Sequence, residues 1–148
     1  MEENTDSLGT PEERGTEEPG GGVVKVAVVT GGRNYQMYEQ EWLWFLQTVK
    51  INEVKFVAVG DCRTGVDRKI AGGLIAFYEG AVFHAAWNLL GKKAGSIRNG
   101  RMADFAASQI ERGVCIAFPG ASGTNGCKLL CTQAGLQLLE WRRRDSAM

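Results

Sequence analysis

Histidine and long apolar runs are scarce in this sequence, and each scarcity excludes a class of function. Histidine occurs once among 148 residues, at His84. Without a second histidine or a Cys-x-x-Cys pair, we expect no bound metal and no cofactor. No apolar run approaches the roughly 20 residues that a membrane-spanning helix needs. The first residues are acids and glycines rather than a basic and then an apolar segment, so we expect no signal peptide and a cytoplasmic protein.

Acidic and basic residues are equal in number, 17 each, but they are unevenly distributed. Residues 1–22 contain seven acids, one base and almost no apolar side chains. Such a segment cannot bury enough apolar surface to offset the entropy lost on ordering, so we expect 1–22 to be a disordered acidic tail. The remaining sixteen bases and ten acids give the expected domain, 23–148, a formal charge of +6. This charge favours an anionic partner, although a solvated basic surface has the same composition.

The four cysteines are expected to be free thiols, because nothing in the sequence indicates secretion. Cys115 stands in an apolar run and is expected to pack in the core. Cys127 and Cys131 are one helical turn apart and could share a metal. No histidine or further cysteine at a suitable spacing supports such a site.

Apolar runs rich in β-branched residues alternate along the chain with segments of helical periodicity, a pattern typical of a parallel sheet covered on both faces. Strands are expected at 23–29, 54–60, 81–86, 114–118 and 136–141. Helices are expected at 36–50, at 66–78, from 98 or 99 to 112, and from about 124. In the third helix, Met102, Phe105, Ala106 and Ile110 are expected to share a face, and the preceding segment from Trp87 is expected to be a loop. The predicted fold is α/β, with a mostly parallel sheet of about five strands and helices on both faces.

Three glycine-bearing loops follow predicted strands, and ligands of such sheets bind beyond the carboxyl ends of the strands. Glycines let backbone N–H groups approach an anion, and the start of a helix supplies unpaired donors. We therefore expect the loops to form one ligand site together with the basic segment around Lys92 and Lys93. The expected ligand-binding residues are Gly31, Gly32, Arg33, Gly60, Gly65, Asp67, Arg98, Asn99, Pro119, Gly120, Ser122, Gly123 and Thr124.

Each of these features also has a purely structural interpretation. The segment "PGASGT" could be a plain turn whose Ser122 and Thr124 cap a helix. It matches neither the P-loop motif nor the dinucleotide fingerprint. Arg33 could be an ordinary surface arginine, and Asp67 could stabilise a helix start through the macrodipole. The convergence of several loops at one edge favours the binding site.

Four motifs occur in an order that resembles the YspA-like (DUF2493) small proteins of the SLOG superfamily. They are "VAVVTGGRNY", "GDCRTGVD", "GKKAGSIRN" followed by Met102, and "FPGASGTNGC" followed by "AG". The resemblance covers about 24–139 and extends to the LOG "lysine decarboxylase" proteins and to the DprA core. It implies a Rossmann-like sheet whose glycine loops bind a nucleotide or a nucleotide-derived ligand.

The sequence departs from the LOG pattern at the position where those enzymes have a catalytic glutamate. The LOG motif is PGGxGTxxE, whereas this chain has Ala121 in place of the second glycine and Cys127 in place of the glutamate. A thiol cannot replace a carboxylate that activates water or stabilises an oxocarbenium-like centre. Arg98 resembles the arginine that lies upstream of the motif. Anion binding is therefore expected to be retained more fully than catalysis, and whether the protein is an enzyme stays open.

The leading hypothesis is a sensor or binding protein for a nucleotide-type phosphate ligand. The first alternative is a LOG-type nucleotide N-glycosidase or phosphoribohydrolase, with Asp67 and Arg98 as the catalytic residues. The second is DprA-like binding of single-stranded DNA, which the basic domain and residues 142–144 favour. No stacking aromatics are evident for that role, since Trp42 and Trp44 are expected in core or interface. Because these two tryptophans cannot both face one core, we expect one to be exposed and the protein to form a homodimer or a higher oligomer.

Overall fold

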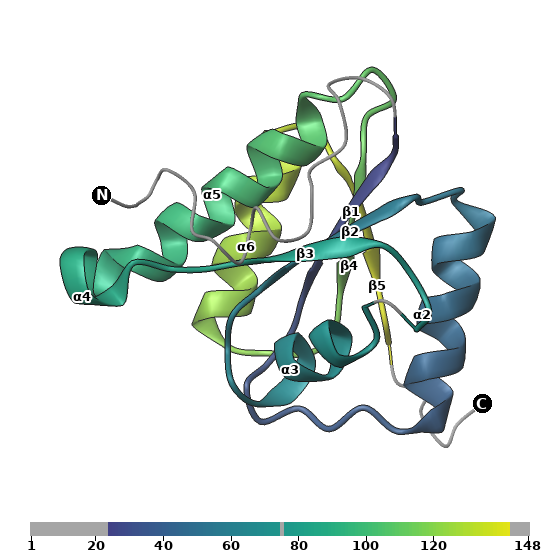
Figure 1. Cartoon of the computed structure of the whole chain (residues 1–148), viewed down its shortest axis with the longest axis horizontal. Coiled ribbons are helices and arrows are strands. Elements are labelled where there is room, and N and C mark those ends of the chain that lie inside the picture. Colours follow the sequence, from purple (N-terminus) through teal and green to yellow (C-terminus); the bar gives the residue numbers. More distant parts are fainter. Residues whose placement is uncertain (1–23, 75, 143–148) are drawn as a thin grey trace.

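Five parallel strands form the centre of the computed structural model, which describes residues 24–74 and 76–142 (Figure 1). The strands are β1 (Val26–Thr30), β2 (Phe56–Gly60), β3 (Gly80–Phe83), β4 (Val114–Ala117) and β5 (Gln137–Glu140). Their order across the sheet is β3-β2-β1-β4-β5, and every neighbouring pair is parallel. This order reverses direction at β1, as in a Rossmann-like fold. The predicted α/β class is therefore confirmed.

The β-branched runs form the inner strands because both faces of a covered parallel sheet must be apolar. Every residue of β1 and of β2 is buried. In contrast, β5 lies at an edge and its residues are half-buried or exposed. The predicted acidic tail and Val23 lie outside the described residues.

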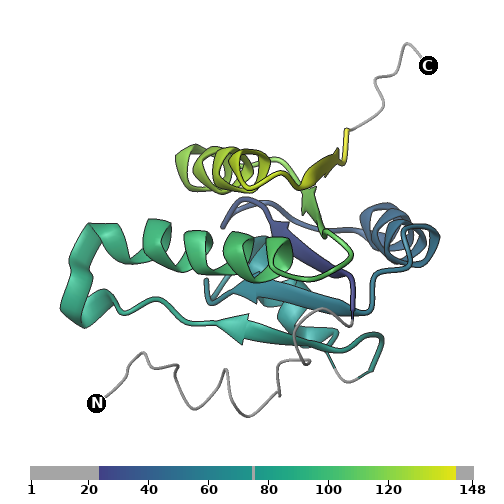
Figure 2. The ribbon, with the colours of Figure 1, turned by 90° about the horizontal axis from the view of Figure 1, so that it is seen from above.

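Helices cover both faces of the sheet (Figures 1 and 2). They are α2 (Glu39–Ile51), α3 (Gly65–Gly72), α4 (Trp87–Leu90), the 3-10 turn η1 (Gly91–Lys93), α5 (Ala94–Ala107) and α6 (Ser122–Gln133). Phe45 of α2 and Ile70 of α3 belong to one core cluster, while Met102 of α5 and Cys131 of α6 belong to the other. Across 24–74 and 76–142, no helix has the length and apolarity to cross a membrane.

The prediction of a loop before Arg98 is wrong, because the chain is helical from Trp87 onward. Within 87–98, only Gly91 has a positive φ, 58°, and it marks the break between α4 and η1. Gly95 lies inside α5, where a Cβ would come within 3.2 Å of the Trp87 ring. Glycine at this position serves close packing rather than a turn, and Arg98 therefore projects from the second turn of a helix.

Two helices end earlier than predicted. Helix α3 stops at Gly72 instead of 78, and Tyr78 returns to donate a hydrogen bond to the carbonyl of Ile70 at 2.5 Å. Helix α5 stops at Ala107 because the side chains of Ser108 and Gln109 bond to the carbonyl of Phe105 and compete with the helical pattern. Helix α5 also begins at Ala94, four or five residues earlier than predicted, and the other predicted bounds agree with the structure within three residues.

The early end of α5 changes which of its predicted face residues are buried. Met102 and Ala106 are buried and Phe105 is half-buried, as expected. Ile110 is 87% exposed and lies beyond the helix. The face predicted for this helix is thus correct for three residues and wrong for the fourth.

Trp42 and Trp44 are both half-buried, so the expectation that one is exposed is wrong. The Trp42 ring packs 6.1 Å from that of Phe77, and the Trp44 ring packs 5.5 Å from that of Trp141. The two sides of α2 thus meet different neighbours of the same domain. Neither tryptophan therefore indicates a dimer interface, and the oligomeric state stays a prediction.

Candidate functional site

A cleft of about 1420 Å³ lies at the carboxyl edge of the sheet, where the loops after β1, β2 and β4 meet α5. Twelve of the thirteen expected ligand-binding residues line it: Gly31, Gly32, Arg33, Gly60, Asp67, Arg98, Asn99, Pro119, Gly120, Ser122, Gly123 and Thr124. Gly65 is the exception. Its φ is +69°, and a side chain there would collide with the carbonyl groups of Gly32 and Arg33. Gly65 therefore holds two loops together and does not face the cleft.

The start of α6 opens into this cleft without a side-chain cap. The N-cap is Ala121, and the first intrahelical bond runs from the N–H of Asn125 to the carbonyl of Ala121 at 2.9 Å. The expectation that Ser122 and Thr124 cap the helix is wrong, because both already lie in its first turn. The first-turn N–H groups have no partner within the helix, and they stand at the positive end of its dipole.

Gly120 holds the loop before α6 against the loop after β1. The N–H of Gly32 donates to the carbonyl of Pro119 at 2.8 Å, and a Cβ on Gly120 would lie 2.8 Å from the nitrogen of Gly32. It would also collide with Thr124, which is itself buried. The backbone donors of the two loops are therefore brought together by the absence of a side chain.

Arg98 forms the centre of a buried charged cluster on the floor of the cleft. Its Nη1 lies 2.5 Å from Oδ1 of Asp61, and its Nε donates to Oδ1 of Asn99 at 2.8 Å. A Cβ on Gly60 would lie 2.7 Å from the guanidinium carbon and equally close to Oδ2 of Asp67. Gly60 thus leaves the space in which the arginine approaches both carboxylates.

Asp61 is the functional candidate that sequence reasoning missed. Besides Arg98, it accepts the N–H of Ala85 at 3.1 Å, and Nδ1 of His84 lies 3.5 Å away. Burial opposes its ionisation, but hydrogen bonds from His84 and Ala85 and the charge of Arg98 outweigh burial and lower its pKa. Its place directly after β2, at the carboxyl end of a buried strand, was the available signal.

Asp67 has the opposite electrostatic environment. It is 8% exposed, lies in the first turn of α3 and accepts the N–H of Cys62 at 3.2 Å. Burial raises its pKa above the ordinary value of 3.8, although Arg98 and the Cys62 N–H partly offset this effect. Two carboxylates around one arginine therefore have pKa values shifted in opposite directions.

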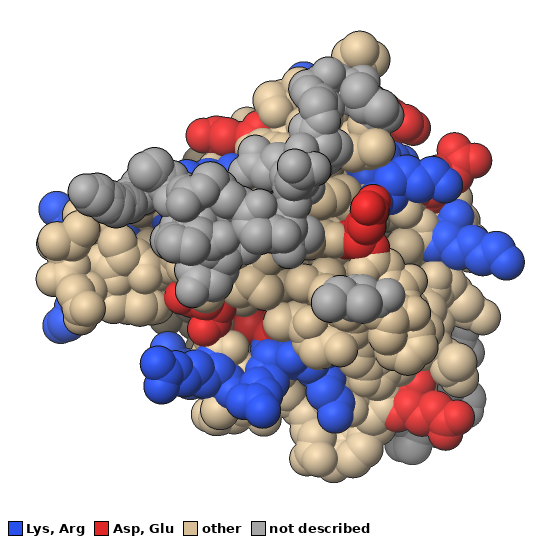
Figure 3. All heavy atoms as spheres, viewed as in Figure 1, with Lys and Arg blue, Asp and Glu red and all other residues tan. Residues whose placement is uncertain are grey.

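Basic side chains surround the entrance of the cleft. Arg33, Arg63 and Lys92 line it, and none of them forms an ion pair with another residue in 24–74 or 76–142. In Figure 3, Lys and Arg side chains gather between the positions of α4 and α3, next to acidic side chains.

Not every basic residue of the predicted segment faces the cleft. Lys93 does not line it, and Arg101 donates to the carbonyl of His84 at 3.1 Å and stacks on Phe83. Arg142 pairs with Glu140, whereas 143 and 144 lie outside the described residues. Single-stranded DNA binding thus stays an untested prediction.

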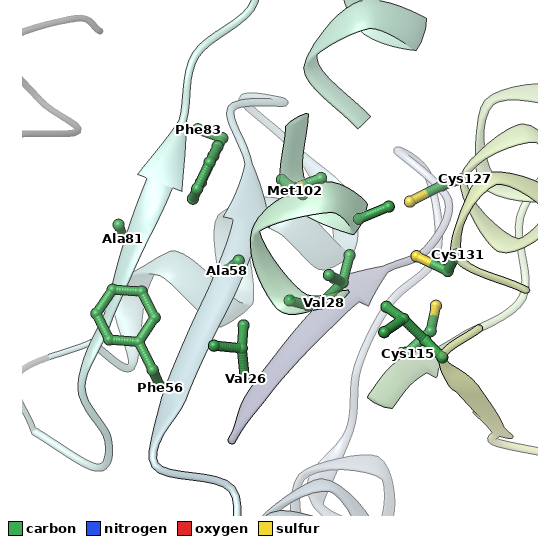
Figure 4. Close-up of a cluster of buried hydrophobic side chains, with 13 residues drawn as sticks. Val26, Val28, Phe56, Ala58, Ala81, Phe83, Met102, Cys115, Cys127 and Cys131 are labelled. Carbon is green, nitrogen blue, oxygen red and sulfur yellow. The ribbon is translucent and has the colours of Figure 1, made fainter. Parts of the chain in front are cut away.

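Cys127, at the position of the LOG glutamate, points into the core and not into the cleft. Its sulfur lies beside those of Cys131 and Cys115 (Figure 4), and all three residues are fully buried. The hydrogen bond with Cys131 and then burial raise the pKa of Cys127 far above its ordinary value, so its thiol stays neutral. Among residues that the structure describes, no three potential ligands group around a metal position. Cys127 therefore supplies neither a carboxylate nor a thiolate to the cleft.

Trp87 is a second residue of the cleft that sequence reasoning missed. It is 51% exposed, begins α4 and lines the cleft together with the loops after β1 and β4. The prediction that no stacking aromatic is evident considered only Trp42 and Trp44 and left Trp87 out. An aromatic residue directly after the third predicted strand, 81–86, was the signal that could have identified it.

Comparisons of this chain with protein-family models, with curated proteins and with solved structures found no match.

Proposed function

We propose that the protein binds a nucleotide or a nucleotide-derived phosphate ligand in the cleft, as a sensor or binding protein. The observation that carries this proposal is the uncapped start of α6, which opens into the cleft beside unpaired basic side chains. Helix starts with glycine-rich loops bind phosphate through their free N–H groups and the helix dipole. The ordered motifs that resemble SLOG proteins favour the same ligand class.

The basic residues at the entrance suit an anion better than a neutral ligand. Arg33 can form two parallel hydrogen bonds to a phosphate, whereas Lys92 acts as a point charge. Because neither is in an ion pair with a described residue, binding a phosphate does not require breaking one. The buried Arg98 is already neutralised by Asp61, so it is expected to orient the ligand more than to attract it.

We expect Lys92→Ala to weaken binding of AMP, ADP-ribose or a cyclic nucleotide by about threefold to tenfold, as for a lost partly exposed charged hydrogen bond. Isothermal titration calorimetry at low salt measures this change. Lys93→Ala is the matched control, because the neighbouring lysine is also exposed but does not line the cleft. Absence of heat with all three ligands, or equal effects of the two variants, would contradict the proposal.

A hydrolytic function is the second candidate, and the buried Asp67 beside Arg98 favours it. In N-glycosidic hydrolysis, water adds to the anomeric carbon, the bond to the base breaks, and the base leaves with the bonding electrons and a proton. An ionised Asp67 could accept the proton of the water or stabilise the positive charge on the sugar. Its raised pKa would make this activity increase with pH as the carboxyl group ionises.

For this candidate, we expect wild-type protein to release free adenine from AMP, and Asp67→Asn to reduce the rate at least about 100-fold. Chromatography of the products measures both. Loss of stability should not explain the effect. Since the pKa of Asp67 is raised on folding, its ionisation above pH 3.8 costs stability, and asparagine removes that cost at pH 7. If wild-type protein binds AMP but releases no adenine, the hydrolase is excluded and the binding function stands.

A further inference from the structure

We propose that Trp87 stacks on the aromatic base of the bound nucleotide and so determines which end of the cleft receives the base. This inference rests on the proposed nucleotide function and extends it by orienting the ligand. The base lies against α4, and the phosphate lies at the start of α6. The protein then distinguishes a nucleotide from a sugar phosphate that has no base.

Trp87 is the tryptophan whose ring the fold leaves open for a ligand to stack on. Trp42 packs against Phe45 and Phe77, and Trp44 and Trp141 pack against each other. Trp87 has no aromatic partner within 24–74 and 76–142, yet half of its surface is exposed and it lines the cleft. Its position in the cleft leaves an aromatic face on which a planar base can stack.

The peptide group between His84 and Ala85 is hydrogen-bonded on both sides, so the chain that leads to Trp87 is held in place. Asp61 accepts the N–H of Ala85, and Arg101 donates to the carbonyl of His84. These two bonds tie the chain after β3 to the loop of β2 and to α5. The backbone that carries Trp87 is thus already ordered, which lowers the entropy lost when a ligand stacks on the ring.

Gly95 brings the Trp87 ring next to the charged cluster. A Cβ on Gly95 would lie 3.2 Å from Cη2 of Trp87 and 3.8 Å from Nη2 of Arg98. The edge of the indole and the guanidinium therefore share the space above one glycine. A base stacked on Trp87 would place its sugar beside Arg98 and the two aspartates.

The order of the strands separates the two ends of the site. Trp87 follows β3 and the phosphate loop follows β4, with β2 and β1 between them. Three strand spacings correspond to about 14 Å. A free phosphate cannot reach both ends, whereas a base, a sugar and a phosphate joined in a row extend along the cleft. Figure 2 shows α4 at one end of the molecule, far from α2.

The test compares AMP with ribose 5-phosphate by calorimetry on the full chain. Wild-type protein is expected to bind AMP about 5-fold to 150-fold more tightly, the range for stacking one base on an aromatic side chain. Trp87→Leu should remove most of this preference and change the affinity for ribose 5-phosphate by less than about twofold. Trp87→Phe should retain part of it. Leu89→Ala is the matched control, because Leu89 lies on the same helix, is 79% exposed and does not line the cleft.

An unchanged affinity of Trp87→Leu for AMP would overturn the stacking role, and so would an equal loss for both ligands. If wild-type protein binds neither compound, the proposed function itself fails. These outcomes are distinguishable because the first two require measurable binding of at least one ligand.

Discussion

Asp61→Asn is expected to lower the free energy of unfolding by about 3 kcal/mol at pH 7. The side chains of Asp61 and Arg98 are 14% and 10% exposed, and removal of one partner from a buried ion pair costs about 3–5 kcal/mol. Asparagine can still accept the N–H of Ala85, so the lower end of this range applies. Urea unfolding followed by tryptophan fluorescence measures the loss.

The pH dependence of this loss has a definite sign. Because the pKa of Asp61 is lowered on folding, its stabilisation is present above the ordinary value of 3.8 and is lost as the pH falls through the lower folded value. The gap between wild type and Asp61→Asn should therefore shrink below about pH 4. For Asp67→Asn the change with pH has the opposite sign, since the pKa of Asp67 is raised.

Asp104→Asn is the control for Asp61→Asn, because Asp104 is exposed on α5 and forms no ion pair in the part of the chain that the structure describes. It should change stability by less than about 0.5 kcal/mol. An Asp61→Asn protein as stable as this control at pH 7 would show that Arg98 does not depend on Asp61 for its charge compensation.

Gly120→Ala is expected to lower stability by about 2 kcal/mol and to weaken phosphate binding at least about tenfold. The added Cβ would meet the side chain of Thr124 and the nitrogen of Gly32, and the latter is backbone that cannot rotate away. Overpacking of this kind typically costs about 1–3 kcal/mol. The two loops must separate, which moves the N–H groups that the proposed phosphate needs.

Gly100→Ala is the matched control for Gly120→Ala. Gly100 lies inside α5, outside the cleft, and a Cβ there meets nothing within 4 Å. Alanine should stabilise this helix by about 0.5–1 kcal/mol and leave ligand affinity unchanged. Urea unfolding and calorimetry applied to both variants separate the two effects. A Gly120→Ala protein that binds AMP like wild type would show that this loop does not hold the phosphate.

The sequence alone was sufficient to predict the parallel sheet and most of the residues that line the cleft. Runs such as Val26–Thr30 and Phe56–Gly60 require two apolar faces, and only a covered parallel sheet supplies them. In a parallel sheet all carboxyl ends share one edge, so the glycine loops that follow the strands had to converge there. Local residue types and the rule that parallel strands end at one edge were enough to identify twelve of the cleft residues.

Helix boundaries depended on contacts that sequence patterns do not contain. Gly95 counted as a loop signal, yet it is helical because the Trp87 ring occupies the space of its side chain. Gly65 counted as a ligand residue, yet it packs against the carbonyl of Gly32. A glycine shows that a side chain is absent, and only its neighbours reveal what fills the space.

The sequence by itself thus determined the fold class, the edge of the sheet at which the cleft forms and the glycine-rich, basic character of its lining. The tertiary structure alone decided how its charges and its aromatic ring are arranged. Asp61 and Arg98 are 37 positions apart, and their pairing depends on the packing of α5 against the end of β2. Local sequence patterns specify which residues reach the carboxyl edge of the sheet. The pKa of a carboxylate and the exposure of Trp87 depend instead on all the side chains and backbone groups within a few ångströms. Those neighbours come from distant parts of the chain.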